Sequence, residues 1–327
     1  MSKKQYIIKR TAQTFLLLFF ILTFLFVFFR LMPGDVTALM TNAGASPEAI
    51  AAVEEKWGLN DPIHVQYLNF MQNLLQGDMG TSLQYKEPVF GFVRQRIFNT
   101  FILVAPGITL AYIVGTFIGT LMGSNRGSRL EKYGIIPLIL SGSFPSFFIA
   151  IGLMTVFSVW LGIFPTSGML SPGFGNEMST WWRQYFTGNF AMHYALPVSA
   201  VVLRYLFNPA LIMRTSVVQV MGEDFTEYHR LTGLPKINRL RHIAKHSFLP
   251  VLTLYPVSMT RALGGLVLIE TVFNWPGIGF TLVEAVLARD FPVVQFCFFV
   301  VAVWVVLANY VVDIIYGLVD PRISVAD

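Results

Sequence analysis

Several charged and amide side chains lie within the later apolar segments of this sequence. Inside a membrane such side chains could bind a polar solute or pair with one another. They are Arg204, Asn208, Arg214, Arg261, Glu270, Asn309 and Asp313. Arg204 and Asn208 are four residues apart, so a helix would present both on one face. An arginine at the centre of a membrane helix costs roughly 2.5–3.5 kcal/mol on insertion scales, so such residues mark transport pathways or pair inside the bundle.

Two interpretations of these residues stay open. A polar lining of a translocation path would use Arg204, Asn208 and Arg261. Interhelical pairing, for instance of Arg261 with Asp313, would instead fix the bundle. Arg214 and Asp313 lie nearer the ends of their segments, where an interfacial or structural role is favoured.

The sequence lacks the motifs of common catalytic and metal sites. It has no GxxxxGK[ST] phosphate loop, no HExxH and no GxSxG motif. Its lone cysteine, Cys297, excludes a cysteine-based metal cluster and is expected to be buried. His242 and His246 have zinc-ligand spacing, but no third ligand lies nearby in the sequence. We therefore predict no catalytic residue, no metal and no cofactor on this chain.

The composition is that of a multi-pass membrane protein. Of the 327 residues, 54% are hydrophobic and 13% are charged, whereas soluble domains have roughly 25% charged residues. The net charge of +5 comes from lysine and arginine near the ends of the apolar segments. This placement indicates membrane topology and no binding of nucleic acid.

Six segments are long and apolar enough to span a lipid bilayer. They lie near residues 8–32, 101–123, 133–161, 194–218, 248–273 and 293–319. Lysine and arginine gather at the amino end, in the second-to-third and fourth-to-fifth connections, and after the sixth segment. The positive-inside rule then places both termini in the cytoplasm. The expected fold is an all-α integral membrane protein with six transmembrane helices in one bundle.

A polar interval, residues 222–246, separates the fourth and fifth segments, and we call it the knob. Glu223, Asp224 and Glu227 lead a short predicted helix, and Gly233 breaks it. A basic run then returns the chain to the membrane at Leu249. Such an arrangement offers a compact contact surface to a cytoplasmic partner.

The connection after the first segment, residues 33–100, is predicted to be a small folded cap on the outer face. Ser46 and Asp61 are each followed by proline and are the predicted N-caps of two helices. The predicted division is therefore an amino-terminal tail and first helix (1–32), the outer cap (33–100) and a five-helix core that includes the knob (101–327).

The second outer connection, residues 162–193, is rich in aromatic residues, among them Trp181 and Trp182. Tryptophan at a membrane edge usually anchors the chain at the interface. Stacking on a ligand such as a sugar is the alternative.

Several stretches of the sequence together resemble one protein family. They are FRLMPGD (29–35), WGLNDPIHVQYLNF (57–70), GDMGTSL (77–83), FPTSGM (164–169), ETVFNWPGIG (270–279), RDFPVVQ (289–295) and NYVVDIIYGLVDPRI (309–323). Through them the whole chain resembles the permease subunits of bacterial ABC importers for dipeptides, oligopeptides and nickel. The first and last of these stretches are similar to the first-named of the two sibling permeases in such importers.

The resemblance implies an ABC type I importer permease fold in the inner membrane. It also implies four kinds of partner: a sister permease that completes a heterodimer, two cytoplasmic ATPase subunits, an extracytoplasmic solute-binding protein and the lipid bilayer. ATP and Mg would be bound by the ATPase subunits and not by this chain.

The knob resembles the coupling loop of the family, whose pattern is Glu-Ala-Ala, three residues and Gly. That register falls on Glu227, Tyr228, His229 and Gly233, so bulky residues replace both alanines. The ATPase-coupling residues that the resemblance implies are Glu223, Asp224, Glu227, Tyr228, His229, Gly233 and Leu234.

Import of oligopeptides or dipeptides is the leading expectation for function. Oligosaccharides and nickel are the alternatives within the family. The alternative from another class is a membrane scaffold that anchors cytoplasmic proteins through the knob and transports nothing.

Overall fold

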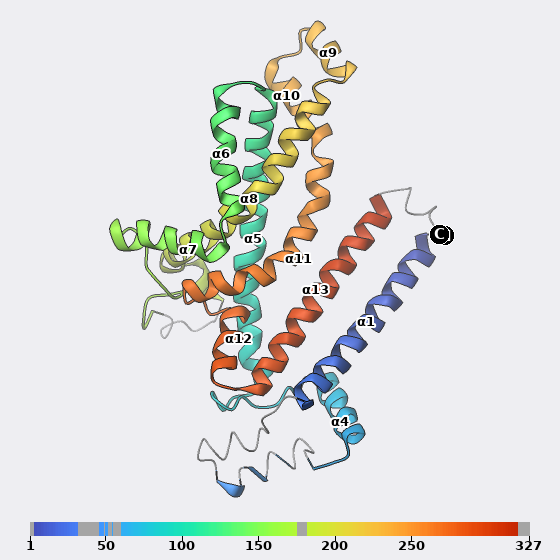
Figure 1. The fold of residues 1–327 in the computed structure, drawn as a ribbon, viewed down its shortest axis with the longest axis vertical. Helices are drawn as coiled ribbons and strands as arrows, with labels where there is room; N and C mark the ends of the chain where they lie inside the picture. Colours follow the sequence, from blue (N-terminus) through green and yellow to red (C-terminus); the bar gives the residue numbers. More distant parts are fainter. Residues whose placement is uncertain are drawn as a thin grey trace. The chain divides into compact units, whose positions relative to one another are not determined.

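The computed structural model describes residues 3–31, 46–48, 50–51, 54, 60–174 and 182–319 (Figure 1). In this part of the chain the regular structure is helical, and extended segments pair only at an isolated bridge between Thr81 and Pro88. The all-helical prediction is confirmed there. The chain divides into a first unit, Met1–Phe98 with Thr281–Asp327, and a second unit, Asn99–Phe280.

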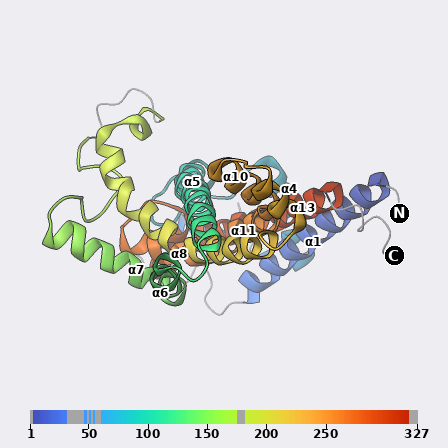
Figure 2. The ribbon, with the colours of Figure 1, turned by 90° about the horizontal axis from the view of Figure 1, so that it is seen from above.

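In the first unit, α1 (Lys3–Leu31) and α13 (Phe291–Val319) run antiparallel side by side (Figures 1 and 2). The Tyr6 hydroxyl donates to the Asp313 carbonyl at 3.1 Å, and the Arg10 guanidinium donates to the Asp313 carboxylate. The Asp313 carboxylate therefore has a partner within the first unit, and its suggested pairing with Arg261 of the second unit stays a prediction. Because the helices are antiparallel, the start of α1 faces the end of α13 and its arginine satisfies the carboxylate.

The helix α4 (Ile63–Gln76) also belongs to the first unit and packs on α1. Its Tyr67 hydroxyl lies 2.7 Å from the Thr23 hydroxyl, and its ring contacts Phe26. The predicted N-cap, Asp61, is wrong by one residue, since Pro62 has an extended ψ of 144° and itself caps the helix. At the other predicted cap, Pro47 is helical and the Ile50 amide donates to the Ser46 carbonyl.

Most of the predicted helix after Ser46 lies outside the described residues. Trp181 and parts of the stretches FRLMPGD, WGLNDPIHVQYLNF and NYVVDIIYGLVDPRI lie outside them as well.

The second unit contains the core of the predicted bundle. Its helices are most of α5 (Val89–Ser124), α6 (Arg129–Ser143), α7 (Ser146–Leu153), η1 (Met154–Trp160), η2 (Arg183–Phe186), α8 (Gly188–Val220), α9 (Asp224–Leu231), α10 (Lys236–Ser247), α11 (Leu249–Val272) and the start of α12 (Ile278–Leu287). The knob, α9 and α10, lies at the same end of this unit as the turn between α5 and α6 (Figure 1).

The predicted third span, 133–161, is not one straight helix. The chain bends by 110° between α6 and the α7–η1 segment. Phe144 is extended there, with ψ of 140°, and Pro145 caps α7. A residue before proline is disfavoured in the α region, which explains the break. The described residues thus contain four helices of membrane-spanning length and apolarity, or up to six if each bent pair counts once.

Close packing of α5 against α8 depends on a row of glycines at helical spacing on α5. These are Gly107, Gly115, Gly119 and Gly123. A Cβ atom on Gly119 would lie 2.3 Å from the Ala210 carbonyl oxygen, and one on Gly123 would lie 2.8 Å from the Arg214 carbonyl oxygen. The two backbones therefore touch, which is how membrane helices gain van der Waals contact where lipid supplies no hydrophobic driving force.

Replacing Gly119 by alanine is expected to lower the free energy of unfolding by about 1–3 kcal/mol, because the new methyl group meets a backbone carbonyl that cannot move alone. Unfolding of the purified protein in detergent measures the change. Gly91→Ala on the same helix is the matched control, since its Cβ would meet nothing within 4 Å. Equal stability of the Gly119 variant and the control would contradict the close contact.

Candidate functional site

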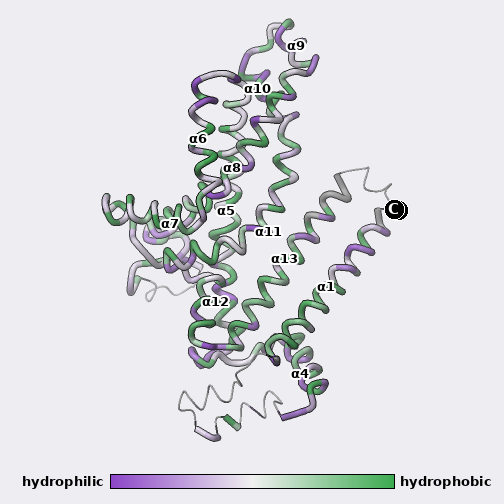
Figure 3. The backbone as a smooth tube through the Cα atoms, in the orientation of Figure 1, coloured by the Kyte–Doolittle hydropathy of each residue, from purple (hydrophilic) through white to green (hydrophobic). Residues whose placement is uncertain are grey.

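The knob folds as two short helices joined at a glycine. Polar residues gather over α9 and α10, whereas α1 and α13 are apolar along most of their length (Figure 3). The predicted helix and the break at Gly233 are confirmed. The basic run after Gly233 is itself a helix, α10, which the sequence reading did not predict.

The turn between the two helices has the hydrogen bonds of a Schellman motif. Gly233 has φ of +73°, and its amide donates to the Arg230 carbonyl at 3.2 Å. The Leu234 amide donates to the His229 carbonyl at 3.1 Å. Glycine adopts a positive φ without the cost that a Cβ atom brings, so this residue sets the angle between α9 and α10.

Aromatic rings hold the inner faces of α9 and α10 together. The Phe225 ring packs on His246 with centroids 5.0 Å apart, and the His229 ring meets His242 at 5.0 Å. Thr226 is buried, and its hydroxyl donates to the Met221 and Glu223 carbonyls. The two helices therefore form one small body that can move as a unit.

The outer face of the knob combines acidic and large apolar side chains. Glu223, Asp224 and Glu227 are exposed, and Tyr228 is 65% exposed. Leu231 and Ile237, at 76% and 71% exposed, continue this apolar surface on both sides of the turn. The sequence reading missed these two residues, although apolar residues inside a polar interval are the signal that reveals them.

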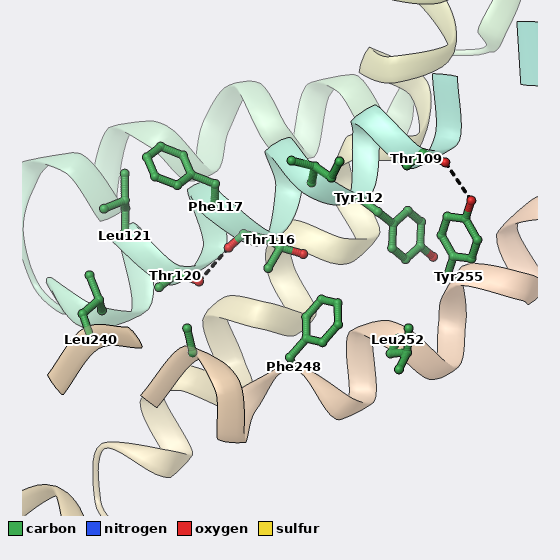
Figure 4. Close-up of a pocket in the computed structure, with 12 residues that line it drawn as sticks. Thr109, Tyr112, Thr116, Phe117, Thr120, Leu121, Leu240, Phe248, Leu252 and Tyr255 are labelled. Atoms are coloured by element: carbon green, nitrogen blue, oxygen red, sulfur yellow. Dashed lines mark hydrogen bonds between the residues drawn. The ribbon is translucent and has the colours of Figure 1, made fainter. Parts of the chain in front are cut away.

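The knob joins the rest of the second unit through α10, which packs on α8 and α11 and buries Ile243 and Ser247. A cavity of about 550 Å³ lies between α5, α10 and α11 (Figure 4). Its lining surface is almost entirely apolar and includes Leu240 of α10, and the hydroxyls of Thr109 and Tyr255 are hydrogen-bonded to each other at 2.7 Å. A shift of the knob would therefore change the packing around this cavity.

Arg214 has the structural role that its position favours. Its guanidinium donates to Glu131 Oε1, with the Nε contact at 2.8 Å, and the Gly127 amide donates to Glu131 Oε2 at 2.6 Å. The Ser128 hydroxyl caps α6 by accepting from the Glu131 amide. This network fastens the α5–α6 turn to α8.

Glu270, near the end of α11, also has a structural role, because its side chain holds the loop between α11 and α12. The side chain is fully buried, and it accepts from the Thr100 hydroxyl at 2.6 Å and the Phe280 amide at 3.0 Å. A Cβ atom on Gly277 would lie 2.1 Å from its Oε1, so only glycine lets the loop close over the carboxylate. The stretch ETVFNWPGIG is thus a loop that folds around the buried Glu270 carboxylate and is held in place by hydrogen bonds to it.

The remaining polar candidates do not pair in this way. Arg204 is half-buried on α8, Asn208 lies exposed one turn further, and Arg261 is exposed on α11. Among the described residues, neither arginine makes an ion pair, and Arg204 contacts the ring of Tyr205 at 5.7 Å from its centroid. No group of three or more metal-ligating side chains occurs in the described residues.

Comparison with known proteins identifies the family. Residues 115–325 match the model for the "binding-protein-dependent transport system inner membrane component", and residues 3–108 match the corresponding N-terminal model. The chain belongs to this permease family. The permease is 33% identical over 323 residues to the oligopeptide transport system permease protein AppB of Bacillus subtilis, covering 98% of this chain and 99% of the relative.

Two further relatives carry a different name. The glutathione transport system permease proteins GsiC of Salmonella choleraesuis and Pectobacterium atrosepticum are 31% and 32% identical to the permease. Each match covers 97% of this chain and 98% of the relative. The resemblance read from the sequence motifs is thereby confirmed along almost the whole chain.

Family membership establishes the class of the protein. It is an inner-membrane, non-catalytic subunit of a binding-protein-dependent ABC importer, so it works with a solute-binding protein and with separate ATPase subunits. ATP hydrolysis belongs to those subunits, and the permease itself carries no cofactor. The predicted class and location are confirmed.

Replacing Glu131 by glutamine is expected to lower the free energy of unfolding by about 1–3 kcal/mol, because it removes a charged acceptor from a pair whose side chains are 30% and 11% exposed. Unfolding in detergent measures the loss. Glu227→Gln is the control, since its contact with Arg230 spans 3.9 Å between side chains that are 68% and 58% exposed. The control should change stability by less than about 0.5 kcal/mol. A loss no greater in the Glu131 variant would show that its pair does not hold the turn.

Proposed function

We propose that this permease forms one half of the membrane pathway of an ATP-driven importer for small peptides, with a sister permease as the other half. The rigid knob with its exposed apolar and acidic surface is the observation that carries the importer role. The names of the relatives, which describe oligopeptide and glutathione transport, support a peptide cargo. Oligosaccharide or nickel import within the same family is the alternative cargo.

In this proposal the knob is the contact with the ATPase subunits. Tyr228 and Leu231 would enter a cleft of the ATPase, while Glu223, Asp224 and Glu227 line the rim of the contact. His229 and Leu234 would support the surface from within, and Gly233 would set its angle. Because α9 and α10 are held together by ring contacts, closure of the paired ATPases would move them as one body and alter the packing around the cavity behind α10.

The proposed topology places the knob and both termini in the cytoplasm. In the second unit, the basic α5–α6 turn and the basic α10 lie at one end (Figure 1), as the positive-inside rule requires of cytoplasmic connections. Residues 33–100 would then form the outer cap that receives the binding protein. The three-part division into residues 1–32, 33–100 and 101–327 belongs to the same proposal.

Arg204, Asn208 and Arg261 are the proposed polar lining of the pathway. They lie near the middle of α8 and of the bent helix α11, and the arginines lack internal ion pairs among the described residues. A scaffold that only anchors cytoplasmic proteins would not need such costly residues at that depth.

Gentle detergent purification of the permease from its native membrane is expected to recover two ATPase subunits, a sister permease and a binding protein. Mass spectrometry identifies these proteins, and the ligand carried by the binding protein identifies the cargo. Recovery of the folded permease with ATPases but with neither a sister permease nor a binding protein would favour the scaffold.

Replacing Gly233 by proline is expected to lower uptake per ATP hydrolysed by at least about tenfold, since proline cannot adopt a positive φ and has no N–H to donate. Transport and hydrolysis measured together in reconstituted vesicles provide the ratio. Gly233→Asn should retain most of the coupling, because asparagine tolerates the left-handed region. Unchanged coupling in the proline variant would contradict the proposed role of the knob.

A further inference from the structure

Two arginines in the second unit lie midway along α8, which is long enough to span a membrane, and α11, which counts as a span only as a bent pair. Arg204 is equidistant from the ends of α8. Arg261 is at the midpoint of α11, beside the 58° bend between Ala262 and Gly264. Among the described residues, neither guanidinium forms a hydrogen bond or an ion pair.

The two arginines flank a common side chain, Tyr205. The Arg204 guanidinium lies 5.7 Å from the centroid of the Tyr205 ring. The Tyr205 hydroxyl lies 3.5 Å from the Cβ position of Gly265, which follows Arg261 by four residues on the other side of the bend. Arg204 and Arg261 are both close enough to Tyr205 to contribute to the electrostatic potential at its hydroxyl. The packing of α8 on α11 therefore gathers two cations and one hydroxyl in the same region.

The acidic residues described in the second unit are engaged elsewhere. Glu131 pairs with Arg214. Both carboxylate oxygens of Glu270 accept hydrogen bonds, one from the Thr100 hydroxyl and one from the Phe280 amide. Glu223, Asp224 and Glu227 lie in the N-cap and first turn of α9, outside the membrane-length helices. Within this part of the unit, the charges of Arg204 and Arg261 are not compensated.

A charged arginine near the bilayer centre has a high free-energy cost unless it is hydrated or paired. Two arginines without an ion-pair partner are therefore expected to contact water and to bind an anionic group transiently. Guanidinium groups bind carboxylates through two parallel N–H···O hydrogen bonds, which gives them both strength and orientation. The Tyr205 hydroxyl can add a third donor.

We propose that Arg204, Arg261 and Tyr205 form an anion subsite midway along the pathway, which binds a side-chain carboxylate of the passing peptide. The proposal rests on the peptide-import function above and extends it to the charge of the cargo. The subsite speeds the passage of acidic peptides relative to neutral ones of the same size.

The test compares two isosteric radiolabelled probes, Ala-Glu-Ala and Ala-Gln-Ala. Proteoliposomes contain the complete importer and receive binding protein loaded with either peptide. The Arg204→Gln, Arg261→Gln double variant should reduce uptake of Ala-Glu-Ala at least tenfold more than uptake of Ala-Gln-Ala. The Lys-for-Arg double variant, which keeps both charges, should retain most of the preference. Arg129→Gln removes one charge from an exposed position at the start of α6 and is the control.

The outcomes separate the subsite from the underlying function. Equal losses for both probes, or no loss, would overturn the subsite while wild-type uptake still supports peptide import. Uptake of neither probe by the wild-type importer, despite a loaded binding protein, would contradict peptide import itself and the subsite with it. If the double variant does not assemble, the uptake of the two probes is compared in the Arg261→Gln single variant instead. The Arg261 side chain is exposed and makes no described contact that holds the fold, so this variant is expected to assemble.

Discussion

Contact between the backbones of α5 and α8 is the constraint on which the second unit depends. It exists because α5 has glycine wherever a side chain would strike α8, most tightly at Gly119 against the Ala210 carbonyl. In a bilayer the helices gain little from leaving lipid, so their attraction must come from such close approach and from hydrogen bonds. With α8 fixed in this way, Arg214 reaches Glu131, and α10 has a surface on which to pack.

The charged residues of the long helices fall into two groups, those with a partner inside the protein and those without one. Counting charges in the sequence does not distinguish the two groups. Arg10, Asp313, Glu131, Arg214 and Glu270 each satisfy a partner inside the protein. Arg204 and Arg261 do not, among the described residues. In the first group the structure offsets the cost of burying charge with fixed partners. In the proposed function, the second group finds its partners in the pathway, as water or cargo.

In the proposed function, the knob links these interior features to the ATPase subunits. Its outer surface is suited to a protein contact, and its inner surface is held by ring packing and by the turn at Gly233. The helix α10 also lines the cavity between α5 and α11 (Figure 4), so the knob is in direct packing contact with two long helices of the second unit.

The sequence by itself determined that this is a multi-pass membrane protein, because membrane insertion depends on local apolarity and charge, which are visible in any stretch of residues. The helix α9 and the turn at Gly233 were predictable for the same reason, since caps and glycine breaks are local. The 110° break at Pro145 and the one-residue shift at Pro62 were not predicted, although proline had marked both places. The partners of charged residues were decided only by the tertiary structure. Asp313 pairs with Arg10 because α1 and α13 lie side by side, and no sequence spacing reveals which helices are neighbours.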